Sequence, residues 1–158
     1  MRIVLQRVSS ATVTIEGRVT GRIERGLLVL VGIEAADSTA DGEWLAAKIA
    51  KLRLFPDEAA WREPSRGGKM NKSVAEIGGD ILLISQFTLH ASTQKGTQPS
   101  FNQAARPEHA RPIYEQFITQ LTAALGRPIT TGQFGAMMQV ALVNDGPVTL
   151  VLDSKLRE

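Results

Sequence analysis

The sequence predicts an α+β fold: one compact domain, residues 1–158, with a mostly antiparallel, barrel-like sheet and two main helices. Three observations support this fold class. The first third of the chain alternates apolar and polar residues, two segments are short continuous apolar runs, and only two segments repeat apolar residues at helical spacing. Strands therefore outnumber helices, and a doubly wound parallel sheet is not favoured.

The first third of the chain is expected to form strands. Alternating apolar residues predict strands over 2–8 and 12–16, and Glu16-Gly17 predicts a turn before a strand over 19–23. The segment GLLVLVGI, at 26–33, is apolar throughout, which is typical of a strand covered on both faces.

A first helix is expected over 39–52. Asp37 and Ser38 are typical helix-start residues, and the segment after them repeats its larger residues at spacings of three and four. The stretch 56–68 that follows is polar and rich in turn-forming residues, which predicts an exposed loop.

A second helix is expected to end before Gly126, a typical C-terminal stop. Because Pro107 and Pro112 cannot both fit its first turn comfortably, we expect it to start near 109–111, with Pro112 in that turn. Its apolar face contains Ile113, Tyr114, Phe117, Leu121, Ala124 and Leu125.

Two further strand regions carry the candidate motifs. DILLISQFTL, at 80–89, predicts a second buried strand. AMMQVALVN and PVTLVLDS predict two strands joined by a turn at Asp145-Gly146, since Asp-Gly between apolar runs is a strong hairpin signal.

Composition excludes several classes of function. The absence of cysteine excludes disulfides, thiolate nucleophiles and cysteine-ligated metals. No stretch approaches the roughly 20 apolar residues of a membrane span, so we expect a soluble, cytoplasmic protein without a membrane partner. A net charge of +2 is only a weak indication of a polyanionic partner.

Metal and cofactor sites are not predicted. The two histidines, His90 and His109, are not at metal-ligand spacing, and no HExxH motif or carboxylate cluster is present. Glycine-rich nucleotide-binding loops of the GxxxxGK[ST] and GxGxxG kinds are also missing. We therefore expect neither a metal nor a cofactor.

Ser85, Gln86, Phe87 and Thr88 form the first chemically distinctive segment. A buried strand that ends in Ser, Gln and Thr brings hydroxyls, an amide and free backbone N–H groups to a sheet edge, where they can bind a carbonyl oxygen or an oxyanion. The alternative is a strand end whose polar groups bond only a neighbouring loop. From local chemistry both interpretations stay open. The second distinctive segment contains Gly146-Pro147, and on local evidence alone it is a simple hairpin turn.

Together these two segments resemble the signature pair of the D-aminoacyl-tRNA deacylase family. SQFTL and the C-terminal NDGPVT are the two motifs, and the similarity covers essentially the whole chain. Further blocks follow in the family order: RVSSATVTIEG, GLLVLVGI, KIAKLRLFPDE, KMNKSV, QFTLHASTQKG, PSFNQAA, YEQF, TGQFGAMMQVALVNDGPVT and LDS.

The resemblance implies a symmetric homodimer with two active sites at its interface. It implies that Ser85, Gln86, Phe87 and Thr88 line the pocket for the aminoacyl group. It also implies that Gly146-Pro147 of the opposite subunit, joined by a cis bond, enters that pocket as a chiral filter. The substrate would be tRNA carrying a D-amino acid or glycine.

Two positions depart from the family pattern. Gln98 stands where the family usually has Arg, which implies a weaker contact with phosphate or with the loop. The stretch AAWREPSRGG, at 59–68, resembles an insertion, and we expect a surface loop without a catalytic role.

The sequence contains no evident general base for ester hydrolysis. Thr88 as a nucleophile would need an activating base, so we favour water assisted by the ribose 2′-hydroxyl, as the resemblance implies. Two alternatives stay open: a non-catalytic RNA-binding module, and an esterase with Ser85 or Thr88 as covalent nucleophile.

Overall fold

The structure, a computed structural model, describes residues 1–59 and 68–157. The elements are β1 (Arg2–Ile15), β2 (Arg18–Ile23), β3 (Gly26–Gly32), α1 (Thr39–Lys51), β4 (Arg53–Phe55), β5 (Lys72–Ser73), β6 (Asp80–Ser85), the 3₁₀ helix η2 (Phe87–His90), α3 (Pro107–Leu125), β7 (Thr130–Thr131) and β8 (Gln139–Asp153). Most of the stretch expected to be an inserted loop, 60–67, lies outside the described residues.

The main sheet has six strands and is mixed. Its order is β2-β1-β3-β6-β7, and β8 pairs with β1. The pairs that β1 forms with β2, β3 and β8 are antiparallel, as the alternating pattern predicts, whereas β3–β6 and β6–β7 are parallel. Parallel neighbours need a crossover connection, and α1 and α3 lie in the two crossovers. The α+β class, the two helices and the largely antiparallel pairing are therefore confirmed.

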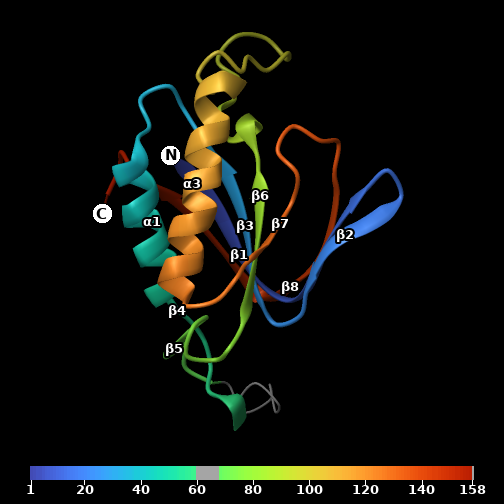
Figure 1. Ribbon diagram of the computed structural model, residues 1–158, viewed down its shortest axis with the longest axis vertical. Coiled ribbons are helices and arrows are strands. Elements are labelled where there is room, and N and C mark those ends of the chain that lie inside the picture. The colour runs from blue at the N-terminus through green and yellow to red at the C-terminus, as the bar shows by residue number, and fades with distance from the viewer. Residues whose placement is uncertain (60–67, 158) are drawn as a thin grey trace.

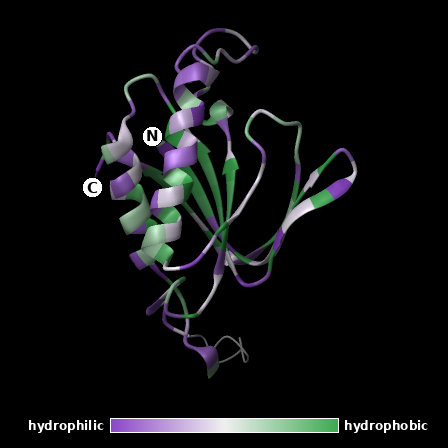
Figure 2. Cartoon of the chain, viewed as in Figure 1, coloured by the Kyte–Doolittle hydropathy of each residue, from purple (hydrophilic) through white to green (hydrophobic). Residues whose placement is uncertain are grey.

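Both faces of the central strands are covered, which explains their continuous apolar runs. The two helices lie side by side over one face (Figure 1), where Leu27, Val29, Ile81 and Leu83 join the larger core. The alternate positions of the same strands, such as Leu28 and Leu82, join a second core on the other face. In Figure 2 the central strands are accordingly hydrophobic along their length.

The sheet curls until it is nearly a closed barrel. β2, at one end of the strand order, approaches β7 at the other: a Cβ built on Gly21 would come 2.7 Å from Thr130 Cγ2. Only glycine lets the backbone come so close. Glu16 and Gly17, both at positive φ, make the turn between β1 and β2 that the sequence predicts.

Helix α1 confirms the first predicted helix. Ser38 caps it, and the Asp41 carboxylate accepts hydrogen bonds from the Ser38 backbone N–H at 2.9 Å and from its hydroxyl at 3.1 Å. These contacts satisfy groups that the helix start would otherwise leave unpaired.

Helix α3 starts earlier than predicted. It begins at Pro107, and Pro112 lies inside it. Pro107 at the first position loses no hydrogen bond, because the N–H there has no partner within the helix anyway. Pro112 leaves the Glu108 carbonyl without its usual partner, and the exposed position of Pro112 lets packing of the opposite face outweigh that loss. Gly126 ends the helix at φ 79°, as predicted.

The predicted hairpin at Asp145-Gly146 is wrong. One strand, β8, runs through this segment and pairs with β1 on both sides of it. Where β1 advances two residues, from Gln6 to Val8, β8 covers five, from Thr149 back to Asn144. Four residues of β8 therefore lie opposite the single residue Arg7 and form a bulge, called here the 145–148 bulge. β8 cannot fold back on itself because β1 is long enough to pair with both halves.

Candidate active site

The end of β6 places free backbone donors beside a cavity. After Ser85 the Gln86 N–H still donates to the Val31 carbonyl at 2.7 Å, and the chain then turns into η2. Phe87 and Thr88 occupy the first positions of η2, where an N–H has no acceptor within the helix. Among the described residues no hydrogen bond takes up either N–H. Two adjacent free donors can bind a carbonyl oxygen or an oxyanion.

The Thr88 hydroxyl has an amide partner. Gln86 Nε2 donates to Thr88 Oγ1 at 2.5 Å. Neither histidine is bonded to it: His109 Nε2 lies 3.3 Å from the Asp37 carbonyl, and His90 is buried with its Nε2 unpartnered within the described chain. The described contacts therefore provide no activating base for Thr88.

The cavity at this strand end has a volume of about 580 Å³. Its walls are mostly apolar, and Ser85 and Gln86 provide the polar side chains. Its lining comprises Val31, Ile33, Ile84, Ser85, Gln86, Phe87, Phe101, Ala104, Ala105, Pro107, Ala110, Phe134, Gly135, Ala136, Met137, Met138 and Val140. None of these side chains is ionisable, so within the described chain the wall offers neither a general acid nor a general base.

Aromatic contacts fix two walls of the cavity. Phe87 and Phe101 meet edge to face with ring centroids 5.2 Å apart. On the α3 side, Phe134 lies against Tyr114 at 5.7 Å and under the Arg111 guanidinium at 5.1 Å. Burial raises the pKa of Tyr114 to about 12, so its hydroxyl stays protonated and donates to the Leu83 carbonyl at 3.2 Å.

The structure brings together three of the four predicted strand-end residues. Ser85, Gln86 and Phe87 line the cavity. Thr88 does not line it, and its hydroxyl accepts a hydrogen bond from Gln86. Gly146 and Pro147 do not line the cavity of their own chain and are both exposed.

Gly146 and Pro147 form the tip of the 145–148 bulge. The bond between them is cis, and Gly146 has a φ of 115°. A Cβ on Gly146 would come 2.6 Å from Arg7 Nη2 and 3.1 Å from Val148 Cγ2, so the backbone packs closely against the arginine. Both the torsion and the spacing favour glycine at this position.

Arg7 and Asn144, which were not expected from the sequence to belong to the site, hold this bulge. Arg7 Nε lies 2.8 Å from the Asp145 carboxylate, and Arg7 Nη1 donates to the Leu54 carbonyl at 2.6 Å. Asn144 Nδ2 donates to the Arg7 and Val148 carbonyls at 3.2 and 3.1 Å. A signal existed for Arg7, because it is a charged residue inside the strand predicted over 2–8.

The position of Gln98 and the absence of metal-binding groups and membrane-spanning helices concern the described residues. Gln98 lies in the exposed loop between η2 and α3. In the described residues no group of three or more His, Cys, Asp or Glu side chains could hold a metal ion. No helix among them has the length and apolar character needed to cross a membrane.

Comparisons with known proteins agree on one family. The family model described as D-Tyr-tRNA(Tyr) deacylase matches residues 4–153. Proteins named D-aminoacyl-tRNA deacylase from Opitutus terrae and Bacteroides thetaiotaomicron are 58% and 55% identical, each over the whole of both chains.

Solved structures share the fold. One titled "c-Myc DNA Unwinding Element Binding Protein" has a TM-score of 0.87 at 41% identity and covers 97% of this chain and 98% of its own. A probable eukaryotic D-amino acid tRNA deacylase has a TM-score of 0.79 and covers 96% of this chain and 97% of its own. At 17% identity, the second likeness concerns the fold alone.

Proposed function

Because this chain belongs to the D-Tyr-tRNA(Tyr) deacylase family, whose members hydrolyse aminoacyl-tRNA esters, we propose that it removes both D-amino acids and glycine from tRNA and rejects L-amino acids. The observation that carries this proposal is the cavity at the end of β6, which combines free backbone donors with a wall that lacks ionisable side chains. Such a site can polarise the ester carbonyl, but proton transfer must then involve a group of the substrate. The cytoplasm, where aminoacyl-tRNA is used, is the expected location.

The hydrolysis follows from these groups. The ester carbonyl oxygen accepts hydrogen bonds from the Phe87 and Thr88 N–H groups, which stabilise the negative charge that forms when water adds to the carbonyl carbon. The ribose 2′-hydroxyl beside the ester assists the water and relays its proton. The bond between the carbonyl carbon and the ribose oxygen then breaks, and that oxygen leaves with a proton as the free hydroxyl of tRNA.

Chiral selection is assigned to the 145–148 bulge of a second copy of the chain. The bulge is exposed and lies outside the cavity of its own chain, and Arg7 and Asn144 hold its backbone firmly. Inserted into a partner's cavity, the Gly146 and Pro147 backbone would leave room for hydrogen, but not for an L side chain, on one side of the α-carbon. Glycine carries only hydrogen there and would therefore be accepted. This arrangement requires a symmetric homodimer.

A covalent route through Thr88 is a second candidate mechanism. The geometry does not favour it, because Thr88 Oγ1 contacts an amide rather than a base and Thr88 does not line the cavity. Trapping of an acyl-enzyme on Thr88 or Ser85 would favour this route instead.

A non-catalytic nucleic-acid-binding module is the alternative from another class. It is favoured by the likeness to a 41% identical solved structure that is described as a c-Myc DNA unwinding element binding protein. If this alternative holds, the protein binds nucleic acid but releases no amino acid from any charged tRNA.

The filter is tested most sharply with the two smallest amino acids. The proposal expects glycyl-tRNA to be hydrolysed and L-alanyl-tRNA, which adds one methyl group on the excluded side, to be spared. Release of radiolabelled amino acid measures both rates. Comparable hydrolysis of the two esters would contradict the filter, and hydrolysis of neither would favour the binding module.

A further inference from the structure

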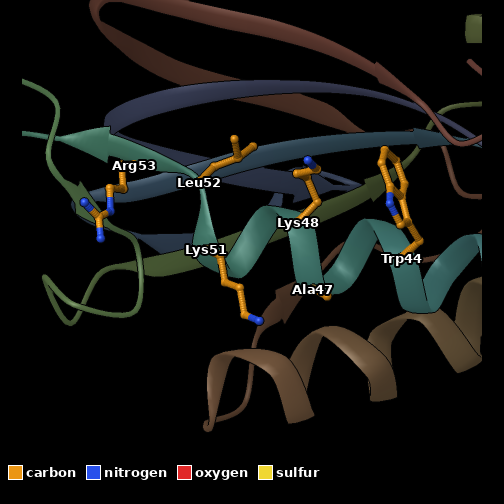
Figure 3. A pocket seen from close by; sticks show the side chains of 6 residues that line it. All are labelled: Trp44, Ala47, Lys48, Lys51, Leu52 and Arg53. Carbon is orange, nitrogen blue, oxygen red and sulfur yellow. The ribbon is translucent and has the colours of Figure 1, made fainter. Parts of the chain in front are cut away.

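A second concave surface lies at the C-terminal end of α1, away from the cavity of the same chain. It has a volume of about 440 Å³ and is lined by Trp44, Ala47, Lys48, Lys51, Leu52 and Arg53. Figure 3 shows Trp44, Lys48 and Leu52 on one side of α1, with Lys51 and Arg53 around the end of the helix. These six residues are called here the α1 groove.

The α1 groove is rich in available positive charge. Lys48, Lys51 and Arg53 make no ion pair within the described chain. The Trp44 ring holds two cations in place, Lys48 Nζ at 5.4 Å and the Arg157 guanidinium at 4.9 Å from its centroid.

Two of three acidic side chains near the groove are engaged by other groups. Asp41, about one turn before Trp44 on α1, forms an ion pair with Lys155 at 2.9 Å. Hydrogen bonds from Ser73 lower the pKa of Glu76, and the charges of Lys72 and Arg53 lower it further. The Glu76 carboxylate lies 3.7 Å from Lys72 Nζ. Glu43, on α1 itself, is exposed and forms no ion pair in the described chain.

The α1 groove is joined to the 145–148 bulge by a short chain of contacts. Arg53 precedes Leu54, whose carbonyl accepts the hydrogen bond from Arg7 at 2.6 Å. The same guanidinium pairs with Asp145, beside Gly146. Only Leu54 and Arg7 therefore lie between Arg53 of the groove and Asp145 of the bulge.

We propose that the α1 groove binds the ribose-phosphate backbone of the tRNA whose charged end lies in the partner subunit's cavity. This inference rests on the proposed function, because it requires the dimer in which the bulge enters that cavity. Lysine and arginine side chains around a concave surface suit successive phosphates, and their contribution depends strongly on salt. Each subunit would then supply both the filter and an RNA contact to its partner.

The test compares two substrates with one double variant. Lys51→Glu with Arg53→Glu should lower kcat/KM for D-tyrosyl-tRNA at least tenfold, mainly through KM, and should weaken the salt dependence of the wild-type reaction. The same variant should hydrolyse D-tyrosine esterified to adenosine at the wild-type rate, because that ester lacks the backbone that reaches the groove.

A matched variant controls for general loss of positive charge. Arg18→Glu with Arg22→Glu makes the same charge change on exposed residues of β2, which lies on the far side of the sheet from α1 (Figure 1), and should leave both substrates unaffected. Equal loss with both variants, or no loss on tRNA with the groove variant, would overturn the proposal.

Binding of uncharged tRNA separates this inference from the proposed function. A wild-type protein that hydrolyses neither ester would contradict the proposed function, whereas the groove is judged by binding alone. The affinity for uncharged tRNA should fall at least tenfold in the groove variant and stay unchanged in the β2 variant. An unchanged affinity in both variants would refute the groove as an RNA contact.

Discussion

At the scale of single residues, Thr88 distinguishes the two mechanisms. Its hydroxyl accepts a hydrogen bond from Gln86, and its backbone N–H is free. Thr88→Ala keeps the backbone donor and removes only the contact that positions Gln86. We therefore expect an intact fold and a partial loss of kcat, about 2- to 12-fold, as for one neutral hydrogen bond. Single-turnover hydrolysis of D-tyrosyl-tRNA measures it, and complete loss with full substrate binding would favour a nucleophilic Thr88.

Gly146 provides a test of the bulge. Gly146→Ala places a Cβ against Arg7 at a φ of 115°, so we expect the free energy of unfolding to fall by about 1–3 kcal/mol and hydrolysis of D-tyrosyl-tRNA to fall more than tenfold. Gly17→Ala is the matched control, since Gly17 also has positive φ but no neighbour within 4 Å. It should cost about 1 kcal/mol and leave activity unchanged. Denaturant unfolding measures both stabilities; similar activity losses in the two variants would contradict a specific role for Gly146.

At the scale of elements, the start of α1 gives a pH-dependent prediction. Burial alone would raise the pKa of Asp41, but hydrogen bonds from Lys155, Ser154 and Ser38 outweigh it and hold the pKa well below its usual value of 3.8. A lowered pKa in the folded state stabilises the fold above about pH 4, and this contribution is lost as the pH falls through the folded value. Asp41→Asn should therefore lower stability by about 1–2 kcal/mol at pH 7 and by less at pH 3.

The control for this prediction lies on the same helix. Glu43→Gln removes an exposed carboxylate and should change stability by less than about 0.5 kcal/mol at either pH. Urea unfolding at pH 7 and pH 3 measures all three proteins. If the deficit of Asp41→Asn were the same at both pH values, the assignment to the ionised carboxylate would be wrong.

Local patterns predicted the elements whose conformation is decided locally. The capped start of α1, the turn at Glu16 and Gly17 and the doubly covered strands all carry their signal within a few residues. The start of α3 and the course of β8 do not. Pro112 is tolerated because of packing elsewhere on the helix, and the 145–148 bulge exists because β1 is long enough to pair on both sides of it.

In the candidate site, too, some residues could be predicted from a local pattern and others could not. Ser85, Gln86 and Phe87 could be found from the polarity at the end of one strand. Phe101 and Phe134 reach the cavity from loops that are distant in sequence, so no local pattern connects them with it. Arg7 and Asn144 belong to strands that pair only in the folded sheet.

At the scale of the whole molecule, the proposed active site requires two copies of the chain. β8 pairs with β1 on one edge only, and in the described chain its other edge has no partner strand. Val143 and Val151 on it are 57% and 66% exposed. We expect a homodimer, and Val151→Asp should weaken it and lower activity, because a charge would be buried without a partner. Sedimentation velocity at assay concentration measures this, and a monodisperse, active monomer would refute the shared site.

In the proposed mechanism the Gly146 and Pro147 backbone reads the α-carbon of an ester bound at the end of β6. The most direct measurement is the rate at which the purified protein deacylates D-tyrosyl-tRNA and L-tyrosyl-tRNA, prepared on the same tRNA and followed side by side. We expect rapid release of D-tyrosine and no release of L-tyrosine above the uncatalysed rate. Equal release of the two enantiomers would contradict this mechanism.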